Sequence, residues 1–175
     1  MRVRPAQLTD ADGAIDVVRR SILGLCQLDH GGDSATLSEW LSNKTADNMR
    51  RWITAHTVLV AIDDDGRISG VAAVRADGVV FLNYVAPEAR FKGASKSLLQ
   101  AIELWASSHG LEWLALESTA TALRFYQSNA GPGRGRRCRA LGLRQEIRCA
   151  RPSCRWPDVS FESRGTILGH HSKFA

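Results

Sequence analysis

The residues best suited to chemistry lie between Val85 and Leu99, where an apolar run leads into a short basic loop and then a helical pattern. The loop combines small residues with cations, in the order Arg90, Phe91, Lys92, Gly93, Ala94, Ser95 and Lys96. A strand-to-helix junction points several unpaired backbone N–H groups at one place, and the helix dipole favours an anion there. Because the small residues leave the backbone accessible and the cations add positive charge, the loop predicts a phosphate or diphosphate site.

Two common phosphate-binding loops do not fit this stretch. A Walker A loop needs glycine directly before Lys-Ser, whereas Lys96-Ser97 follows Ser95. A dinucleotide-binding loop needs three spaced glycines after a first strand and a second βα unit behind them, and both are missing. The sequence therefore disfavours hydrolysis of ATP or GTP and a nicotinamide or flavin cofactor.

The elements that must position this loop begin with a short strand at Val3 and an amphipathic helix from Ala14 to Leu23, with Thr9-Asp10 as its N-cap. A second helical region, in two pieces, is expected between Leu37 and Ile53. Gly31 and Gly32 separate these two regions.

Three apolar, β-branched runs follow, at 57–62, 68–74 and 79–85, with Asp-Gly turns between them. Such turns predict an antiparallel meander. An amphipathic helix stopped by Gly110, a buried strand at 113–117 and a helix at 120–128 come next. Because a strand, a crossover helix and a strand imply a parallel pair, we expect an α/β fold: a mixed, mostly antiparallel sheet with helices on both faces.

The composition is that of one ordinary globular domain, with 175 residues of which 44% are hydrophobic. The apolar runs are much shorter than the ~20 residues of a membrane helix. No secretory leader pattern follows Met1. We therefore expect a cytoplasmic protein with no membrane partner.

At this point a resemblance to a known family is clear. Residues 90–95 resemble the R/Q-x-x-G-x-G/A pyrophosphate loop of the GNAT acetyltransferases, with Ser95 where that pattern has Gly or Ala. About thirty residues further on, the segment from Thr119 to Tyr126 is similar to the family's helix whose aromatic pair ends in a tyrosine beside the coenzyme sulfur. The order of elements from Met1 to Asn129 matches as well.

The resemblance implies that acetyl-CoA is the co-substrate and that its pantetheine arm lies between two splayed parallel strands. The first of these strands would be 79–85, with Tyr84 and Val85 at the coenzyme and the Val85 N–H polarising the thioester carbonyl. Residues 90–96 would bind the diphosphate. Tyr126 would touch the coenzyme and donate its proton to the departing thiolate.

The resemblance also implies an amine acceptor, either a small molecule or a protein. An alkylamine has a reference pKa of about 10.4, so a group must take a proton from it before it can attack. The candidates are Glu117, Asp29, His30 and Glu88, directly or through water, and the sequence does not choose among them. Asp29 and His30 are expected in a loop between the first helices.

The chain changes character near residue 130. Residues 131–175 contain 10 of the 23 Lys and Arg residues and 3 of the 18 acidic residues, so this segment carries +7 and the remainder −2. We therefore expect an acetyl-CoA-binding domain at 1–130 and a divergent basic segment at 131–175, in which only 140–147 favours a strand. The segment is expected to be part of the same domain or partly disordered, or to be replaced in the sheet by a partner's strand.

The tail offers no pattern for metal or nucleic acid. The cysteines of the tail are Cys138, Cys149 and Cys154. They lack the close paired spacing of zinc ligands. Its arginine run lacks interleaved aromatics and any recognised nucleic-acid module, so only non-specific attraction is expected. The leading hypothesis is an N-acetyltransferase, with a catalytically silent acetyl-CoA-binding module as the alternative. Exposed sheet edges in this family often pair between two chains, so a homodimer is a further expectation.

Overall fold

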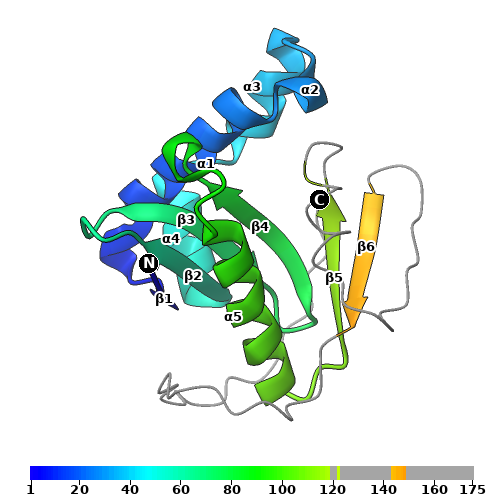
Figure 1. Cartoon of the computed structure of the whole chain (residues 1–175). Helices are drawn as coiled ribbons and strands as arrows, with labels where there is room; N and C mark the ends of the chain where they lie inside the picture. Colours follow the sequence, from blue (N-terminus) through cyan, green and yellow to red (C-terminus); the bar gives the residue numbers. More distant parts are fainter. Residues whose placement is uncertain (119–121, 123–142, 149–175) are drawn as a thin grey trace.

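The computed structural model describes residues 1–118, 122 and 143–148 (Figure 1). The described elements are, in chain order, β1 (Arg2–Pro5), η1 (Leu8–Asp10), α1 (Ala11–Leu25), α2 (Gln27–His30), α3 (Ser34–Ser42), α4 (Ala46–Ala55), β2 (Thr57–Ile62), β3 (Ile68–Val74), β4 (Val79–Val85), η2 (Pro87–Ala89), α5 (Ala94–Ser108), β5 (Trp113–Ser118) and β6 (Leu143–Arg148). The two η elements are short 3-10 helices.

The strands form one sheet in the order β1-β2-β3-β4-β5-β6. Every neighbouring pair is antiparallel except β4 and β5, which are parallel. Helix α5 connects these two strands, as a parallel crossover requires. The predicted fold class, a mixed and mostly antiparallel sheet, is confirmed.

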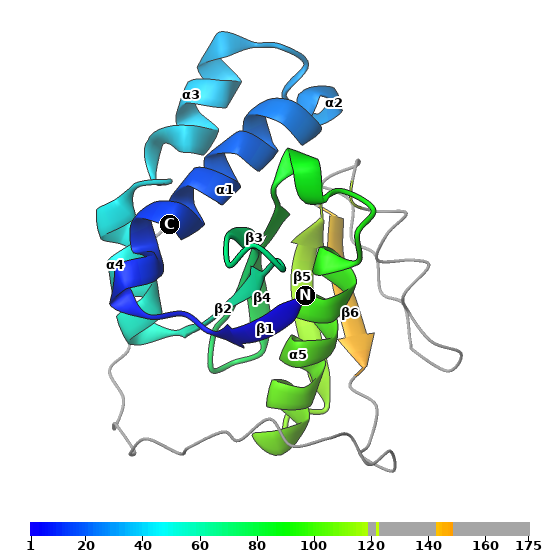
Figure 2. The ribbon, with the colours of Figure 1, turned by 60° about the vertical axis from the view of Figure 1, so that its left-hand side comes forward.

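Helices cover both faces of this sheet. Figure 2 shows α1 and α4 on one side of the strands and α5 on the other. Because successive strand residues point to opposite faces, Val58 and Val60 pack in the core beneath α1 and α4, whereas Leu59 and Ala61 pack in the core beneath α5. Burial on both faces explains why β2 and β3 are continuous apolar runs.

The strands before the loop have the bounds that the sequence predicted, at 57–62, 68–74 and 79–85. In the second Asp-Gly turn, Gly78 has φ 84°, and a Cβ atom there would lie 2.8 Å from the carbonyl oxygen of Trp113. Only glycine satisfies both the left-handed backbone and this close approach. The turn thereby lets β4 start directly beside β5, whose Ala115 N–H donates to the Gly78 carbonyl oxygen at 3.0 Å.

Two local expectations need correction. Asp29 and His30 lie in the one-turn helix α2 rather than in a loop, because the chain continues from α1 with only Cys26 between the two helices. Asp10 is the N-cap residue of α1, yet its carboxylate caps nothing in that helix. It instead accepts hydrogen bonds from Arg4 at 2.6 and 2.9 Å and from the Gln7 N–H at 2.7 Å.

The basic segment contributes a strand to the sheet. β6 lies within three residues of the predicted 140–147 range and pairs antiparallel with β5 from Trp113↔Arg148 to Ser118↔Leu143. The outer edge of β5 is therefore covered by this chain itself, which corrects the expectation of a partner's strand there. The predicted helix at 120–128 lies outside the described residues, apart from Ala122.

Candidate active site

Strands β4 and β5 pair only where β4 begins. Val79 pairs with Ala115 and Val80 with Leu116, whereas β4 continues alongside β3 as far as Val85. Figure 1 shows the two strands moving apart beyond this pairing. The last five residues of β4 consequently have no register partner in β5.

The backbone N–H and C=O of Val85 point to the side of β4 from which β5 has moved away. The next amide, that of Ala86, donates to the Ser69 carbonyl oxygen in β3 at 2.9 Å. Since backbone groups alternate sides along an antiparallel strand, the N–H and C=O of Val85 point away from β3. Val85 therefore presents a strand edge to the opening between β4 and β5.

The loop after β4 turns sharply into α5. Gly93 is the N-cap residue of that helix, with φ 88° and ψ −2°, and no side chain caps the helix. A Cβ atom at Gly93 would meet nothing within 4 Å, so the space beside its backbone is open. Because the first N–H groups of a helix have no intrahelical acceptor, those of Ala94, Ser95 and Lys96 form an uncapped anion cradle among the described residues.

Basic side chains surround this cradle. Arg90, Lys92 and Lys96 are all exposed, so their charges are available to a ligand. Phe91 between them is 91% exposed and has φ 62°, a left-handed conformation that is uncommon outside glycine. The guanidinium carbon of Arg90 lies 4.6 Å from the centroid of the Phe91 ring. The loop thus carries three exposed cations within seven residues.

The start of α5 is held close to the sheet by a glycine in β3. A Cβ atom at Gly70 would lie 2.9 Å from Leu98 Cδ1 and 3.3 Å from the Tyr84 carbonyl oxygen. Ala94 and Leu98 are both buried against the sheet. The absence of a side chain at Gly70 lets the first turns of α5, and with them the cradle, lie directly against the end of β4.

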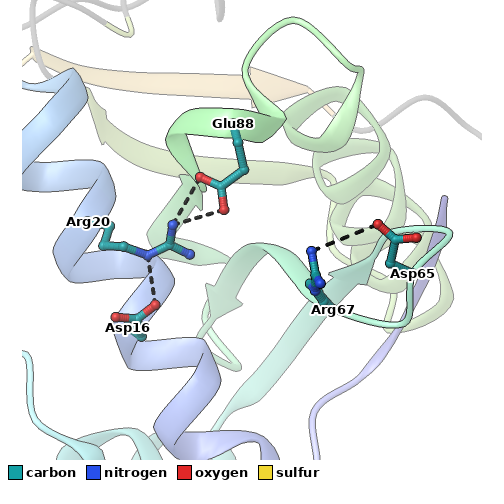
Figure 3. A network of polar contacts seen from close by, with 5 residues as sticks. All are labelled: Asp16, Arg20, Asp65, Arg67 and Glu88. Atoms are coloured by element: carbon teal, nitrogen blue, oxygen red, sulfur yellow. Dashed lines mark hydrogen bonds and ion pairs between the residues drawn. The ribbon is translucent and has the colours of Figure 1, made fainter.

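The loop is also tied to α1 through a salt bridge that the sequence did not reveal (Figure 3). Nη1 of Arg20 donates to both carboxylate oxygens of Glu88, at 2.9 and 3.0 Å, while its Nε donates to Asp16 at 2.7 Å. Glu88 lies in η2, directly before the predicted diphosphate loop. Arg20 therefore joins the segment before that loop to helix α1. The sequence did not predict this contact, because Arg20 and Glu88 lie far apart along the chain.

The predicted proton acceptors differ in what their surroundings allow. The hydrogen bond from Arg20 lowers the pKa of the Glu88 carboxyl below its ordinary value, which makes Glu88 a weak base. His30 accepts a hydrogen bond at Nδ1 from the Gly32 N–H at 3.2 Å, so its neutral ring carries the proton on Nε2. That Nε2 is buried without a hydrogen-bond partner among the described residues. A ring in this state donates through Nε2 and does not accept there.

The remaining predicted site residues are distributed as follows. Asp29 lies in α2 beside His30, and Glu117 lies in β5. Tyr84 packs its side chain, partly buried, against the core beneath α1 and α4. Tyr126 lies outside the described residues.

Cys26 is the free cysteine of the described residues and is buried. Burial and, to a smaller extent, the negative charge of Asp29 together raise the pKa of its thiol to about 11. A thiol of this kind is almost wholly protonated at neutral pH and is a poor nucleophile. Cys26 is therefore a packing residue.

The described residues contain neither a metal-binding cluster nor a membrane-spanning helix. No group of three or more His, Cys, Asp or Glu side chains there could hold a metal ion. None of the helices in the described ranges has the length and apolar content that a bilayer crossing needs.

Comparison with known proteins identifies the family. The model of the acetyltransferase (GNAT) domain matches residues 26–129, which is more than half of the chain. The chain therefore belongs to the GNAT family of acetyltransferases, and acetyl-CoA is the acetyl donor of this family. The family match ends one residue before the predicted boundary at 130.

Solved structures of the family share the fold. The PaiA N-acetyltransferase of Thermoplasma acidophilum, solved with coenzyme A, superimposes with a TM-score of 0.70 at 18% identity, covering 84% of this chain and 98% of that one. A GCN5-related N-acetyltransferase of Rhodopseudomonas palustris gives a TM-score of 0.68 at 18% identity and covers 84% and 92%. YncA, a putative acetyltransferase of Salmonella typhimurium solved with acetyl-CoA, gives 0.62 at 16% identity and covers 91% and 99%. No curated protein sequence matches this chain significantly.

Proposed function

We propose that this chain binds acetyl-CoA at the junction of β4 and α5 and transfers the acetyl group to a primary amine by direct attack in a ternary complex. The observation that carries the proposal is the loss of β4–β5 pairing after Val80, immediately before an uncapped helix N-terminus. An extended thioester arm needs an unpaired strand edge, and a diphosphate needs unpaired amides. Both lie within one short segment of this chain.

The residues of the loop fit the nucleotide end of the coenzyme. The amides of Gly93 to Lys96 would hold the diphosphate, because a helix N-terminus favours negative charge. Arg90, Lys92 and Lys96 would add charge-assisted hydrogen bonds. The open space beside Gly93 admits a phosphate to the backbone without a side chain in its way.

The chemistry requires a new C–N bond and loss of the C–S bond. In the proposal, the amine nitrogen attacks the thioester carbonyl carbon while the Val85 N–H donates to the carbonyl oxygen, which becomes negative as the bond forms. Collapse of this intermediate expels the coenzyme thiolate, which takes a proton from Tyr126. The raised pKa of the Cys26 thiol supports direct attack, because it disfavours an acetylated Cys26.

The proton leaving the amine needs an acceptor, and the Glu88 carboxylate is already paired with Arg20, which lowers its pKa and its basicity. We assign this task to Asp29 or Glu117, directly or through water. His30 would act by donating a hydrogen bond from Nε2. The acceptor molecule in this proposal is a small amine or a protein amine.

The test is release of coenzyme thiol from acetyl-CoA in the presence of a panel of small amines and lysine peptides, together with a binding titration of acetyl-CoA. An active enzyme releases thiol above the amine-free rate with at least one acceptor class. Tight binding of acetyl-CoA without thiol release on any amine would favour the catalytically silent module. Absence of binding would contradict both functions.

A further inference from the structure

The backbone of Phe91 has a conformation that is unusual for a residue with a side chain. Its φ of 62° is the one positive φ outside glycine among the described residues. A residue with a side chain pays about 1–2 kcal/mol for such a backbone relative to the right-handed region. Strain of this kind in a ligand-binding loop is a reason to look for a function of the side chain it displays.

The ring that this backbone displays is almost entirely in solvent. Phe91 is 91% exposed, the most exposed of the large hydrophobic residues in the described ranges. Removal of the ring would therefore leave no cavity in the core. The exposed ring and the strained backbone are both unfavourable in the protein without ligand. Contact between the ring and a ligand would remove the ring from water and so offset the exposure.

The ring has one occupied face. The Arg90 guanidinium lies over it with its carbon 4.6 Å from the centroid, within the range of a cation–π contact. Stacking uses the flat face of a guanidinium and leaves its N–H groups free to donate at the edges. Phe91 can thus hold Arg90 in place while Arg90 still donates to phosphate oxygens. The high exposure of Phe91 means that much of its surface away from Arg90 is open to a second flat partner.

We propose that Arg90 and Phe91 form a platform for the nucleotide end of acetyl-CoA, in which the open face of Phe91 stacks on the adenine and Arg90, held by the same ring, pairs with a phosphate. This inference rests on the proposed function, since it needs the coenzyme at this loop. It adds the assignment of a base-stacking role to Phe91 and explains why a phenylalanine is found at a backbone position that suits glycine. Aromatic stacking on a nucleobase typically contributes about 1–3 kcal/mol.

Three substitutions separate the ring from the backbone strain. Phe91→Ala removes the ring and keeps a side chain in the left-handed region. Phe91→Gly removes the ring and also relieves the strain. Phe91→Tyr keeps an aromatic face and the strain. Because the ring is exposed, all three variants should retain the melting temperature of the parent within a few degrees.

The experiment is isothermal titration of each variant with acetyl-CoA, with adenosine 3′,5′-bisphosphate and with S-acetylpantetheine, which lacks the nucleotide. We expect Phe91→Ala and Phe91→Gly to weaken acetyl-CoA and the bisphosphate by roughly tenfold and Phe91→Tyr to bind like the parent. The affinity for S-acetylpantetheine should not change in any variant.

Several outcomes would overturn the inference. If Phe91→Gly bound acetyl-CoA as well as the parent, the ring would contribute nothing and only the backbone would matter. If S-acetylpantetheine weakened as much as acetyl-CoA, Phe91 would act on the loop as a whole. In both cases the parent still binds acetyl-CoA, and the proposed function stands. A parent chain that does not bind acetyl-CoA would remove both proposals together.

Discussion

Arg20 in α1 and Glu88 in η2 are 68 positions apart in the sequence, and Nη1 of the guanidinium donates to both oxygens of the carboxylate. This contact ties η2, which directly precedes the predicted diphosphate loop, to a helix on the opposite face of the sheet from α5 (Figures 2 and 3). It also pairs the Glu88 carboxylate, one of the predicted proton acceptors, with a guanidinium that lowers its pKa.

The first prediction concerns Glu88 as a base. Glu88→Gln should leave the shape of the pH profile of turnover unchanged, since the Glu88 carboxylate is paired with Arg20, which lowers its pKa. Both partners are substantially exposed, at 40% for Arg20 and 62% for Glu88, so the loss in stability should be at most about 1 kcal/mol. A general base is active only when deprotonated, so loss of the acidic limb of the pH profile in this variant would show that Glu88 accepts the proton.

The second prediction concerns the acid sensitivity of the fold. The hydrogen bonds from Arg4 lower the pKa of Asp10, whose side chain is 12% exposed. A carboxyl with a depressed folded-state pKa stabilises the fold above its unfolded pKa, and this contribution disappears as the pH falls toward the folded-state pKa. Asp10→Asn should therefore lower the free energy of unfolding by about 2 kcal/mol at pH 7.

Urea unfolding of the parent and Asp10→Asn at pH 7 and at about pH 3 tests this. The difference between the two proteins should shrink at the lower pH, where Asp10 of the parent begins to be protonated. An equal difference at both pH values would mean that the ionised carboxylate contributes nothing.

The third prediction compares the two ends of α5. Gly93 and Gly110 both have left-handed φ values, 88° and 73°, and a Cβ atom at either would meet nothing within 4 Å. Alanine at either position should cost about 1–2 kcal/mol of stability for the same backbone reason. Only Gly93→Ala should also weaken acetyl-CoA, by roughly tenfold, because relief of the strain moves the amides of the cradle.

Melting curves and acetyl-CoA titrations of both variants are the measurement, with Gly110→Ala as the matched control. Equal loss of affinity in the two variants would indicate a general effect of destabilising α5. Unchanged affinity in Gly93→Ala would remove this glycine from the binding site.

The fourth prediction concerns Cys26. A buried thiol with a pKa of about 11 does not form an acetyl-enzyme at neutral pH, so Cys26→Ala should keep kcat within a few-fold of the parent. Mass spectrometry of the parent incubated with acetyl-CoA should find Cys26 unmodified. An acetyl group on Cys26 that an added amine removes would replace direct attack by a two-step mechanism.

The fifth prediction concerns Tyr126, which the family resemblance makes the proton donor. Tyr126→Phe should lower kcat substantially and change the Kd of acetyl-CoA little, because the phenol acts on the leaving thiolate and not on the bound ground state. Steady-state kinetics and a titration separate the two effects. Equal losses in kcat and affinity would make Tyr126 a packing residue.

The sequence predicted the parts of the molecule whose signals are local. The bounds of β2, β3 and β4 follow from β-branched runs and Asp-Gly turns, and Gly78 shows why the second turn needs its glycine. The parallel pairing of β4 and β5 follows from the strand, helix and strand order. The loop at 90–96 was predicted as a phosphate site because it combines small residues with cations just before a helix, and that role stays a prediction.

The remaining features depend on contacts that no local pattern contains. The α2 helix is a single turn, too short to produce a helical period, and so Asp29 and His30 were expected in a loop. The pairing of Arg20 with Glu88 depends on how α1 packs on the sheet. The positive φ of Phe91 could not be foreseen, because left-handed backbone is expected at glycine and Gly93 lies only two residues away.

The central claim is that the amides at the junction of β4 and α5 hold the diphosphate of acetyl-CoA, and a crystal structure of the chain grown with coenzyme A tests it most directly. We expect diphosphate oxygens about 3 Å from the N–H groups of Gly93 to Lys96, with the pantetheine arm beside Val85. Coenzyme bound elsewhere on the chain, or a cradle filled by the loop's own side chains in crystals that hold the coenzyme, would contradict it.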